Sequence, residues 1–276
     1  MNKKIIYYFV PTWIFSILLP FLAIASAEAN DPVGVWGLIM EYGILVLLII
    51  GVLVMRNVLK KFGDSMMGKL FTYFSIGTIL LVTMRIFIHL VELNFVSISF
   101  GALHFYWHII FYLALVSFYF GLKGLVDLAD GKDGEIPNMI NKWKIFSIIS
   151  IFLIFVLSIT TGSIYDSFYN SSIFESFGLH HFIAFALSVI LSYYLIQSRK
   201  KIGMIGSGIA TPFILSLSLF GLQHFWELLT ESWKFIIVEE EIIEHVEQYI
   251  VIIAVFLLVY TFIQLKKITS GNQARS

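Results

Sequence analysis

The chain has 276 residues, of which 59% are hydrophobic and only 13% are charged, and it contains 27 phenylalanines. This composition excludes an ordinary soluble domain, in which about a quarter of the residues are charged. The formal net charge is zero, and the absence of cysteine excludes disulfides, thiolate metal ligands and cysteine nucleophiles. Any bound metal must therefore be held by nitrogen and oxygen.

The first 27 residues predict a signal peptide or an N-terminal anchor. The segment begins with a pair of lysines, continues as an apolar run from residue 5 to residue 24, and ends in the small residues Ala25-Ser26-Ala27. These features are typical of a signal peptide with its cleavage site. The apolar run is longer than most signal-peptide cores, so a retained anchor stays an alternative.

Further apolar stretches predict transmembrane helices, each close to the roughly 20 residues that cross a hydrocarbon core of about 30 Å. They cover residues 37–55, 70–93, 103–122, 145–162, 177–197, 209–229 and 246–265. Long, continuously apolar stretches satisfy their backbone hydrogen bonds internally, whereas the strands of a membrane β-barrel are short and alternate in polarity. We therefore predict an all-α polytopic membrane protein with seven transmembrane helices, or eight if the N-terminal segment is retained.

The distribution of charge predicts the orientation of these helices. Most of the 18 lysines and arginines fall on one side of the seven-helix arrangement, which is expected to be the cytoplasm. Most of the 18 acidic residues lie at or beyond the opposite helix ends. We expect a multi-pass protein of the cell membrane, with the N-terminus outside after signal cleavage and the C-terminus in the cytoplasm. The outer face should attract cations and repel nucleic acid.

The sequence also predicts an internal duplication. The segment EYGILVLLIIGVLVMRNVLKKFG from Glu41 aligns without a gap with HFIAFALSVILSYYLIQSRKKIG from His181. The following helices carry HLVE and HFWE, and the third helices open with HFYWH and EIIEH. We predict a three-helix unit in residues 28–126 and a second one, followed by a cytoplasmic tail, in residues 166–276. A cytoplasmic loop and connecting helix in residues 127–165 would let both copies enter from outside.

Histidines and glutamates concentrate in the outer part of these helices. Counting about 1.5 Å per residue from the cytoplasmic lysines and arginines places the histidines in the outer third of the membrane. The motif His-x-x-Glu and pairs spaced four residues apart put two side chains on one helix face, as in metal sites of helix bundles. The predicted metal ligands are Glu41, His89, Glu92, His104, His108, His181, His224, Glu227, Glu241 and His245.

Imidazole and carboxylate ligands favour iron, zinc or Cu(II), because Cu(I) prefers sulfur ligands. The residues predicted to take part in catalysis are Arg85, Glu92 and Glu227. Arg85 lies one helical turn below His89, and a cation at this depth is costly unless it is paired. Its partner is expected to be a carboxylate from another helix, a bound anion or a haem propionate.

The leading hypothesis is a membrane protein with a transition-metal site near its outer face, used for redox chemistry or for handling the metal ion. Its partners would be the lipid bilayer and either a metal cation or a small or lipophilic substrate from the outer side. One alternative is haem b, held by His89 with His224 or by His108 with His245 and linked to quinol. This arrangement is similar to that of haem-handling membrane enzymes built as duplicated bundles.

Two further alternatives stay open. A metal-cation transporter would use the same histidines, but the cytoplasmic half of the helices offers few polar residues for an ion path, and transport sites usually lie near the midplane. A purely structural use would make each histidine an interhelical hydrogen-bond partner. The concentration of the histidines at one membrane level favours a shared role over separate structural ones.

Overall fold

The computed structural model describes residues 32–62, 65–92, 95, 98–130, 146, 149, 177–199 and 203–271. At a few helix ends it describes the backbone but not the side chains, and Glu92 and Glu241 are among these residues. The predicted N-terminal segment lies outside the described residues. So does the predicted span 145–162, apart from Phe146 and Ile149.

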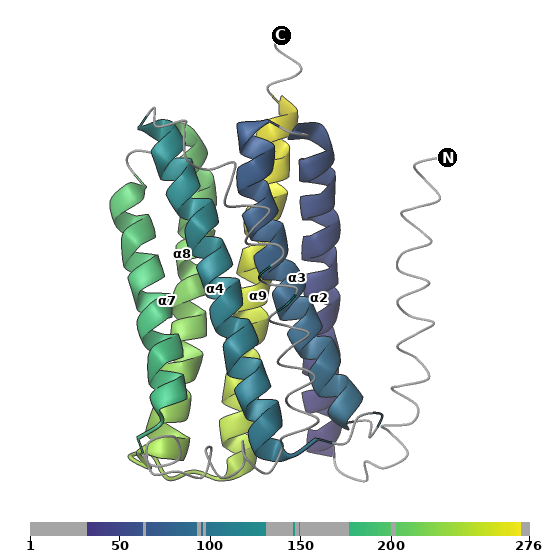
Figure 1. Cartoon of the computed structure of the whole chain (residues 1–276). Coiled ribbons are helices and arrows are strands. Elements are labelled where there is room, and N and C mark those ends of the chain that lie inside the picture. Colours follow the sequence, from purple (N-terminus) through teal and green to yellow (C-terminus); the bar gives the residue numbers. More distant parts are fainter. Residues whose placement is uncertain are drawn as a thin grey trace.

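The described part of the chain is helical throughout (Figure 1). Its long helices are α2 (Pro32–Phe62), α3 (Met66–Glu92), α4 (Phe100–Ala129), α7 (Leu179–Ser198), α8 (Gly203–Glu227) and α9 (Glu240–Gly271). A π-helical turn, η1 (Leu228–Ser232), follows α8. Each of the 6 long helices contains an apolar stretch of 20 to 27 residues, long enough to cross a membrane. This fits the predicted polytopic helical protein, whereas the count of seven or eight spans stays a prediction.

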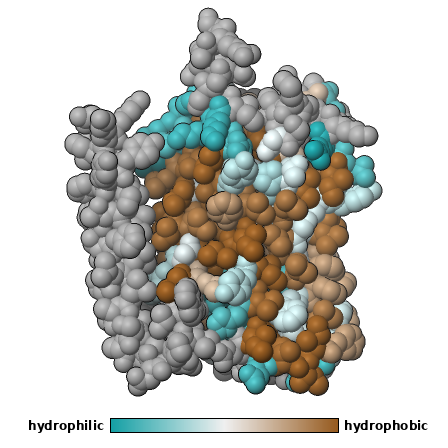
Figure 2. All heavy atoms as spheres, turned by 180° about the vertical axis from the view of Figure 1, so that it is seen from behind, coloured by the Kyte–Doolittle hydropathy of each residue, from teal (hydrophilic) through white to brown (hydrophobic). Residues whose placement is uncertain are grey.

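The surface of the bundle is largely apolar. Large hydrophobic side chains point outward, such as Ile190 and Tyr193 on α7 and Phe256 on α9, which are 59%, 63% and 55% exposed. Figure 2 shows hydrophobic surface across the middle of the molecule and hydrophilic surface mainly at its upper edge. A helix that is apolar on all sides suits a lipid environment better than water. The surface therefore agrees with helices that lie in a membrane.

The helices form a closed bundle. Helix α3 packs between α2 and α4, and α8 packs between α7 and α9. Contacts of α2 with α9 and of α4 with α7 complete the order α2, α3, α4, α7, α8, α9 around the bundle. The starts of α2, α4, α7 and α9 lie at the same end as the last residues of α3 and α8 (Figure 1). We call this end the site end.

Aromatic side chains fill the half of the bundle away from the site end. The ring of Phe74 in α3 meets Phe213 of α8 and Phe262 of α9 edge to face, and Phe118 of α4 meets Phe213 in the same way. Gly77 permits this packing, because a Cβ there would lie 2.5 Å from the ring of Phe118. Among the described residues, this half is thus held together by tight apolar packing.

A glycine determines how α7 begins. Gly178 caps this helix with a φ of 65°, a conformation that side chains with a Cβ rarely adopt. A Cβ on Gly178 would also lie 2.3 Å from Oγ of Ser232, the last residue of η1. The start of α7 therefore packs directly on the π-helical turn.

Replacing Gly178 with alanine should destabilise the protein. The positive φ alone costs roughly 1 to 2 kcal/mol in a residue with a Cβ, and the collision with Ser232 adds to this cost. The thermal unfolding midpoint of the protein in detergent should fall by several degrees. Gly208→Ala is the matched control, because the added Cβ meets no atom within 4 Å. Equal midpoints for the two variants would contradict the close contact between α7 and η1.

Candidate metal centre

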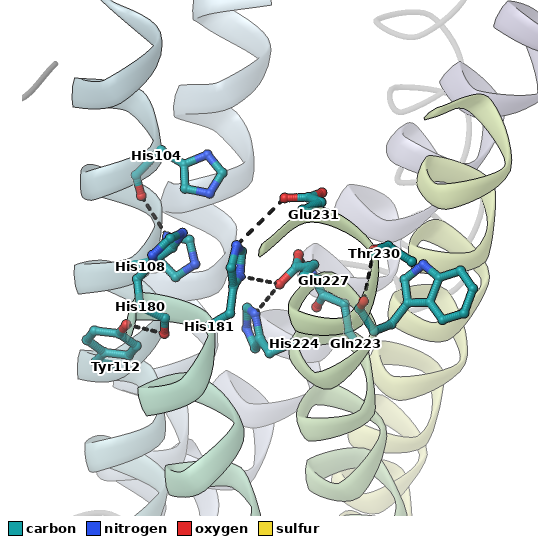
Figure 3. A network of polar contacts seen from close by, with 11 residues as sticks. His104, His108, Tyr112, His180, His181, Gln223, His224, Glu227, Thr230 and Glu231 are labelled. Atoms are coloured by element: carbon teal, nitrogen blue, oxygen red, sulfur yellow. Dashed lines mark hydrogen bonds and ion pairs between the residues drawn. The ribbon is translucent and has the colours of Figure 1, made fainter. Parts of the chain in front are cut away.

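Histidines from three helices meet inside the site end of the bundle (Figure 3). Helix α4 contributes His104 and His108, α7 contributes His180 and His181, and α8 contributes His224. The ring centroids of His180 and His181 are 4.0 Å apart, those of His108 and His180 are 4.6 Å apart, and those of His181 and His224 are 5.9 Å apart. These rings therefore surround a common volume instead of pointing separately at lipid.

Helix geometry explains how α4 and α7 present two histidines each. His104 and His108 are four residues apart, so they lie on one face of α4 with ring centroids 4.8 Å apart. His180 and His181 are neighbours in the first turn of α7, which packs against both α4 and α8, and both are buried. The hydroxyl of Tyr112 on α4 donates a 2.7 Å hydrogen bond to the carbonyl oxygen of His180. This bond ties α7 to α4 at the cluster.

Glu227 is a buried carboxylate that contacts two of these rings. Its Oε2 lies 2.5 Å from Nδ1 of His224 and 2.6 Å from Nδ1 of His181. Its Oε1 accepts a 2.8 Å hydrogen bond from Nε2 of Gln223. Because a carboxylate only accepts hydrogen bonds, Nδ1 of His224 carries a proton, and the neutral ring keeps its lone pair on Nε2. Nδ1 of His181 lies nearly as close but does not have the geometry of a hydrogen bond. Glu227 can thus orient the ring of His224 for metal binding through Nε2, and it can also bind the ion itself.

The protonation of His108 follows from the same reasoning. Its Nδ1 lies 2.8 Å from the carbonyl oxygen of His104, which only accepts, so Nδ1 donates and the neutral ring has its lone pair on Nε2. The Nε2 atoms of His108 and His224 are buried without a hydrogen-bond partner among the described residues. Buried polar atoms normally have partners. Two such nitrogens in one cluster therefore favour a site for an ion.

Two overlapping sets of side chains have the spacing of a metal site. The first set comprises His104, His108, His180 and His181, and the second comprises His108, His181, His224 and Glu227. Within each set, ligand atoms of the four residues all lie within 4.8 Å of one another. Small adjustments would bring such atoms to the roughly 2 Å from a common ion that direct coordination requires. The structure thus contains a buried His/Glu group that could hold a metal ion.

The turn η1 places a second carboxylate over the cluster. Oε2 of Glu231 lies 3.7 Å from Nε2 of His181, and the side chain of Glu231 is 41% exposed. The hydroxyl of Thr230 donates a 2.8 Å hydrogen bond to the carbonyl oxygen of Trp226, which satisfies an acceptor at the start of the turn. Short π-helical segments are rare and often occur at functional sites. Glu231 therefore links the buried cluster to the surface at the site end.

Among the predicted ligands, the structure brings together His104, His108, His181, His224 and Glu227. Neither set of described side chains includes Glu41, His89 or His245. His89 instead stacks on Tyr42, with ring centroids 4.9 Å apart. The side chains of Glu92 and Glu241 lie outside the described part of the chain, so their assignment as ligands stays a prediction.

His180 joins the cluster although the sequence pattern does not select it. In the predicted duplication His181 aligns with Glu41, whereas His180 aligns with Met40, which offers no matching ligand. Neighbouring helix residues also point about 100° apart, so one of two usually faces away. Both face the cluster because the first turn of α7 packs against two helices. The consecutive histidines are the signal that could have identified this residue.

Arg85 has its carboxylate partner on another helix. Its Nη1 lies 2.7 Å from Oε2 of Glu41, and the two side chains are 7% and 16% exposed. The guanidinium also lies over Trp107, 5.6 Å from the ring centroid, where a cation is attracted to the ring. Of the partners that the sequence allows, the structure shows an interhelical ion pair between α2 and α3. A catalytic role of Arg85 stays a prediction.

Comparisons of the chain with protein-family models, with curated proteins and with solved structures found no match. No family therefore supplies a substrate, a cofactor or a reaction for this site. The functional proposal rests on the burial, spacing and chemistry of the clustered side chains.

Replacing Glu41 with glutamine should lower the free energy of unfolding by roughly 3 kcal/mol, because it leaves the charge of Arg85 uncompensated inside the bundle. Adding Arg85→Met should recover much of this loss, since the double variant has no buried charge at this place. Unfolding of the single and double variants in detergent measures the coupling. If Glu41→Gln alone were as stable as the unchanged protein, the ion pair would not stabilise the bundle.

Proposed function

We propose that this protein binds a transition-metal ion in the His/Glu cluster and uses it for redox chemistry at the outer face of a cell membrane. One observation carries the proposal, namely that buried imidazoles and a carboxylate from three helices converge with the spacing of metal ligands. Burial of these polar groups costs free energy, and apolar side chains of the same size would pack without this cost. A bound ion offsets the cost because it binds the imidazole lone pairs.

The ligand atoms narrow the choice of metal. The cluster offers imidazole nitrogen and carboxylate oxygen, and the chain has no cysteine. Iron, zinc and Cu(II) suit such ligands, whereas Cu(I) prefers sulfur. Redox chemistry selects iron or copper, because zinc has no redox chemistry.

The proposed reaction is the oxidation of a small or lipophilic reductant. An ion held by the histidines of the cluster would supply one-electron chemistry, in which the reductant would lose one electron to the ion and one proton to a carboxylate, and a one-electron acceptor would then take up the electron. Glu231 suits the proton-accepting role, because it lies beside His181 and is partly exposed, so that the proton can continue to water. The buried Glu227 keeps the rings of His181 and His224 in place during this exchange.

The apolar half of the bundle favours chemistry at the site over transport of an ion through the protein. An ion that crosses a membrane protein needs polar groups to replace its water. Among the described residues, the half away from the site end contains packed phenylalanines and a cavity whose lining is apolar except for Thr261. The buried polar side chains that the structure describes beyond the cluster and Arg85 are serines and threonines, such as Ser188, Ser192 and Ser216, and none of them is a histidine or a carboxylate.

The spacing of the rings favours a metal ion without a porphyrin. Two histidines that hold one haem iron lie on opposite faces of the porphyrin, so the macrocycle separates them. In the cluster, by contrast, rings of neighbouring helices contact each other directly, as His108 and His180 do. The pairs considered for haem b are His89 with His224 and His108 with His245. Only His224 and His108 belong to the cluster, because neither set of four ligands includes His89 or His245.

The helix order supports the duplication that we also propose. Around the bundle, α2 lies opposite α7, α3 opposite α8, and α4 opposite α9, as expected for two three-helix units related by a twofold axis. In this relation Glu41 corresponds to His181, and His89 corresponds to His224. Glu41 of the first unit thus lies in an ion pair, whereas the corresponding His181 belongs to the cluster. Helix α4 of the first unit also contributes His104 and His108 to the cluster.

The charges support an orientation with the cluster outside. Lys60 and Lys61 lie in the last turn of α2, at the end of the bundle away from the cluster, and cytoplasmic loops are rich in such residues. A span in residues 145–162 would return the chain between α4 and α7, which both start at the site end. We therefore propose a seven-helix topology with an outer N-terminus and a cytoplasmic C-terminus.

The purified protein should contain iron or copper in a stoichiometric amount, as measured by elemental analysis and an absorption spectrum. His224→Ala should lose most of this metal because it removes a buried ligand, whereas the matched variant His245→Ala should keep it, since neither set includes His245. Removal of the metal with a chelator should lower the unfolding midpoint of the unchanged protein but not that of His224→Ala, because a bound ion stabilises the folded state.

Several outcomes would overturn the proposal. Protein that takes up no metal, even from excess Fe(II) or Cu(II), would remove it entirely. A Soret band would show that the protein binds haem instead. Equal metal loss in His224→Ala and His245→Ala would show that the metal does not bind in the cluster. A bound metal that never changes its oxidation state with chemical reductants would leave metal handling in place of redox chemistry.

A further inference from the structure

We propose that Glu231 and His181 form an entry site, at which a divalent transition-metal cation from the surface binds before it reaches the buried cluster. This inference rests on the proposed function, because it concerns how the same cluster is loaded. Glu231 belongs to neither set of four ligands, so the entry site adds a residue and a step to the metal centre.

His181 joins a buried carboxylate to an exposed one (Figure 3). Its Nδ1 lies 2.6 Å from Oε2 of Glu227, whose side chain is 4% exposed, and its Nε2 lies 3.7 Å from Oε2 of Glu231, whose side chain is 41% exposed. When its proton is on Nδ1, beside the carboxylate of Glu227, the neutral ring presents its lone pair on Nε2. That lone pair lies on the side of the ring that faces Glu231.

The separation of 3.7 Å suits a shared cation better than a direct hydrogen bond. A hydrogen bond between nitrogen and oxygen is about 2.7 to 3.2 Å long. Two ligands that each lie about 2.1 Å from one ion can be up to about 4.2 Å apart. With a single nitrogen and a single oxygen ligand, the cation keeps most of its water here and exchanges quickly, as an entry site requires.

The fold holds Glu231 and His181 in this relation. Glu231 lies in the turn η1, and Ser232 of the same turn packs on Gly178, the residue that caps α7. His181 follows in the first turn of α7. The two residues of the entry site are therefore connected through a tight contact between their own elements, which limits their relative movement.

The inner part of the cluster can receive the cation from this position. His181 belongs to both sets of four ligands, and its ring centroid lies 5.0 Å from that of His108 and 5.7 Å from that of His104. A cation held by Nε2 of His181 can thus exchange its remaining waters for imidazoles one at a time. Glu231 stays behind at the surface and is released for the next ion.

The experiment measures metal uptake by the metal-free, full-length protein in detergent, with Co(II) as the probe because its absorption spectrum reports coordination. In stopped-flow mixing, Glu231→Gln should slow Co(II) uptake about tenfold, in the range by which charged groups accelerate the binding of ions. The final number of ions per chain and the final spectrum should stay unchanged. Glu231→Asp, which keeps a carboxylate, should retain most of the uptake rate.

Glu239→Gln is the matched control. Glu239 is also an exposed glutamate near the site end, just before α9, and its substitution removes the same charge. Uptake by this variant should slow less than about twofold, because only the long-range attraction of the cation changes. Equal slowing in Glu231→Gln and Glu239→Gln would overturn the entry site, since the effect would then be one of overall charge.

Two other results separate this inference from the function on which it rests. A lower final Co(II) content in Glu231→Gln would overturn the entry role and make Glu231 a ligand of the resident ion. Failure of the unchanged protein to bind Co(II), Fe(II) or Cu(II) would overturn the proposed metal centre itself. The unfolding midpoint of each variant confirms that it is folded.

In the unchanged protein, added salt should slow Co(II) uptake more strongly than it does in Glu231→Gln.

Discussion

The contact of one buried carboxylate with two imidazoles organises the site end of the bundle. One oxygen of Glu227 lies within 2.6 Å of Nδ1 of both His181 and His224, and the other accepts a hydrogen bond from Gln223. A carboxylate with so little exposure would be costly without these partners. Because the partners come from α7 and α8, the requirement to compensate this one charge also sets how the two helices meet. The remaining histidines of the cluster are positioned relative to that junction.

Two carboxylates inside the bundle, Glu41 and Glu227, have different kinds of partner. Glu41 is neutralised by Arg85, and the pair joins α2 to α3 beside Trp107. Glu227 instead has imidazoles of α7 and α8 as its partners. A neutral imidazole can bind a cation through its lone pair, whereas a guanidinium has no lone pair to offer. This difference gives a physical reason why the surroundings of Glu227 suit a metal ion and those of Glu41 do not.

Particular residues show how far the sequence could lead. His104, His108, His224 and Glu227 could be identified because their spacings of four and three residues place them on one helix face, whatever the helix packs against. His180 could not be selected by spacing, since consecutive residues diverge on a helix. His89 has the same motif and depth as His224 but stacks on Tyr42, and its motif alone contains no information about the neighbouring helix. Arg85 required a partner, but only packing could choose Glu41 among the acidic residues.

The sequence by itself determined that the chain forms long apolar helices and that its histidines lie at one level of them. Both conclusions depend on local quantities, namely hydrophobicity along the chain and the constant rise per residue of a helix. Only the tertiary structure decided which helix faces turn toward each other, and therefore which imidazoles share a pocket. That choice depends on the rotation of each helix about its own axis. Side-chain packing between helices sets this rotation, whereas the amino-acid pattern of a uniformly apolar helix does not determine it.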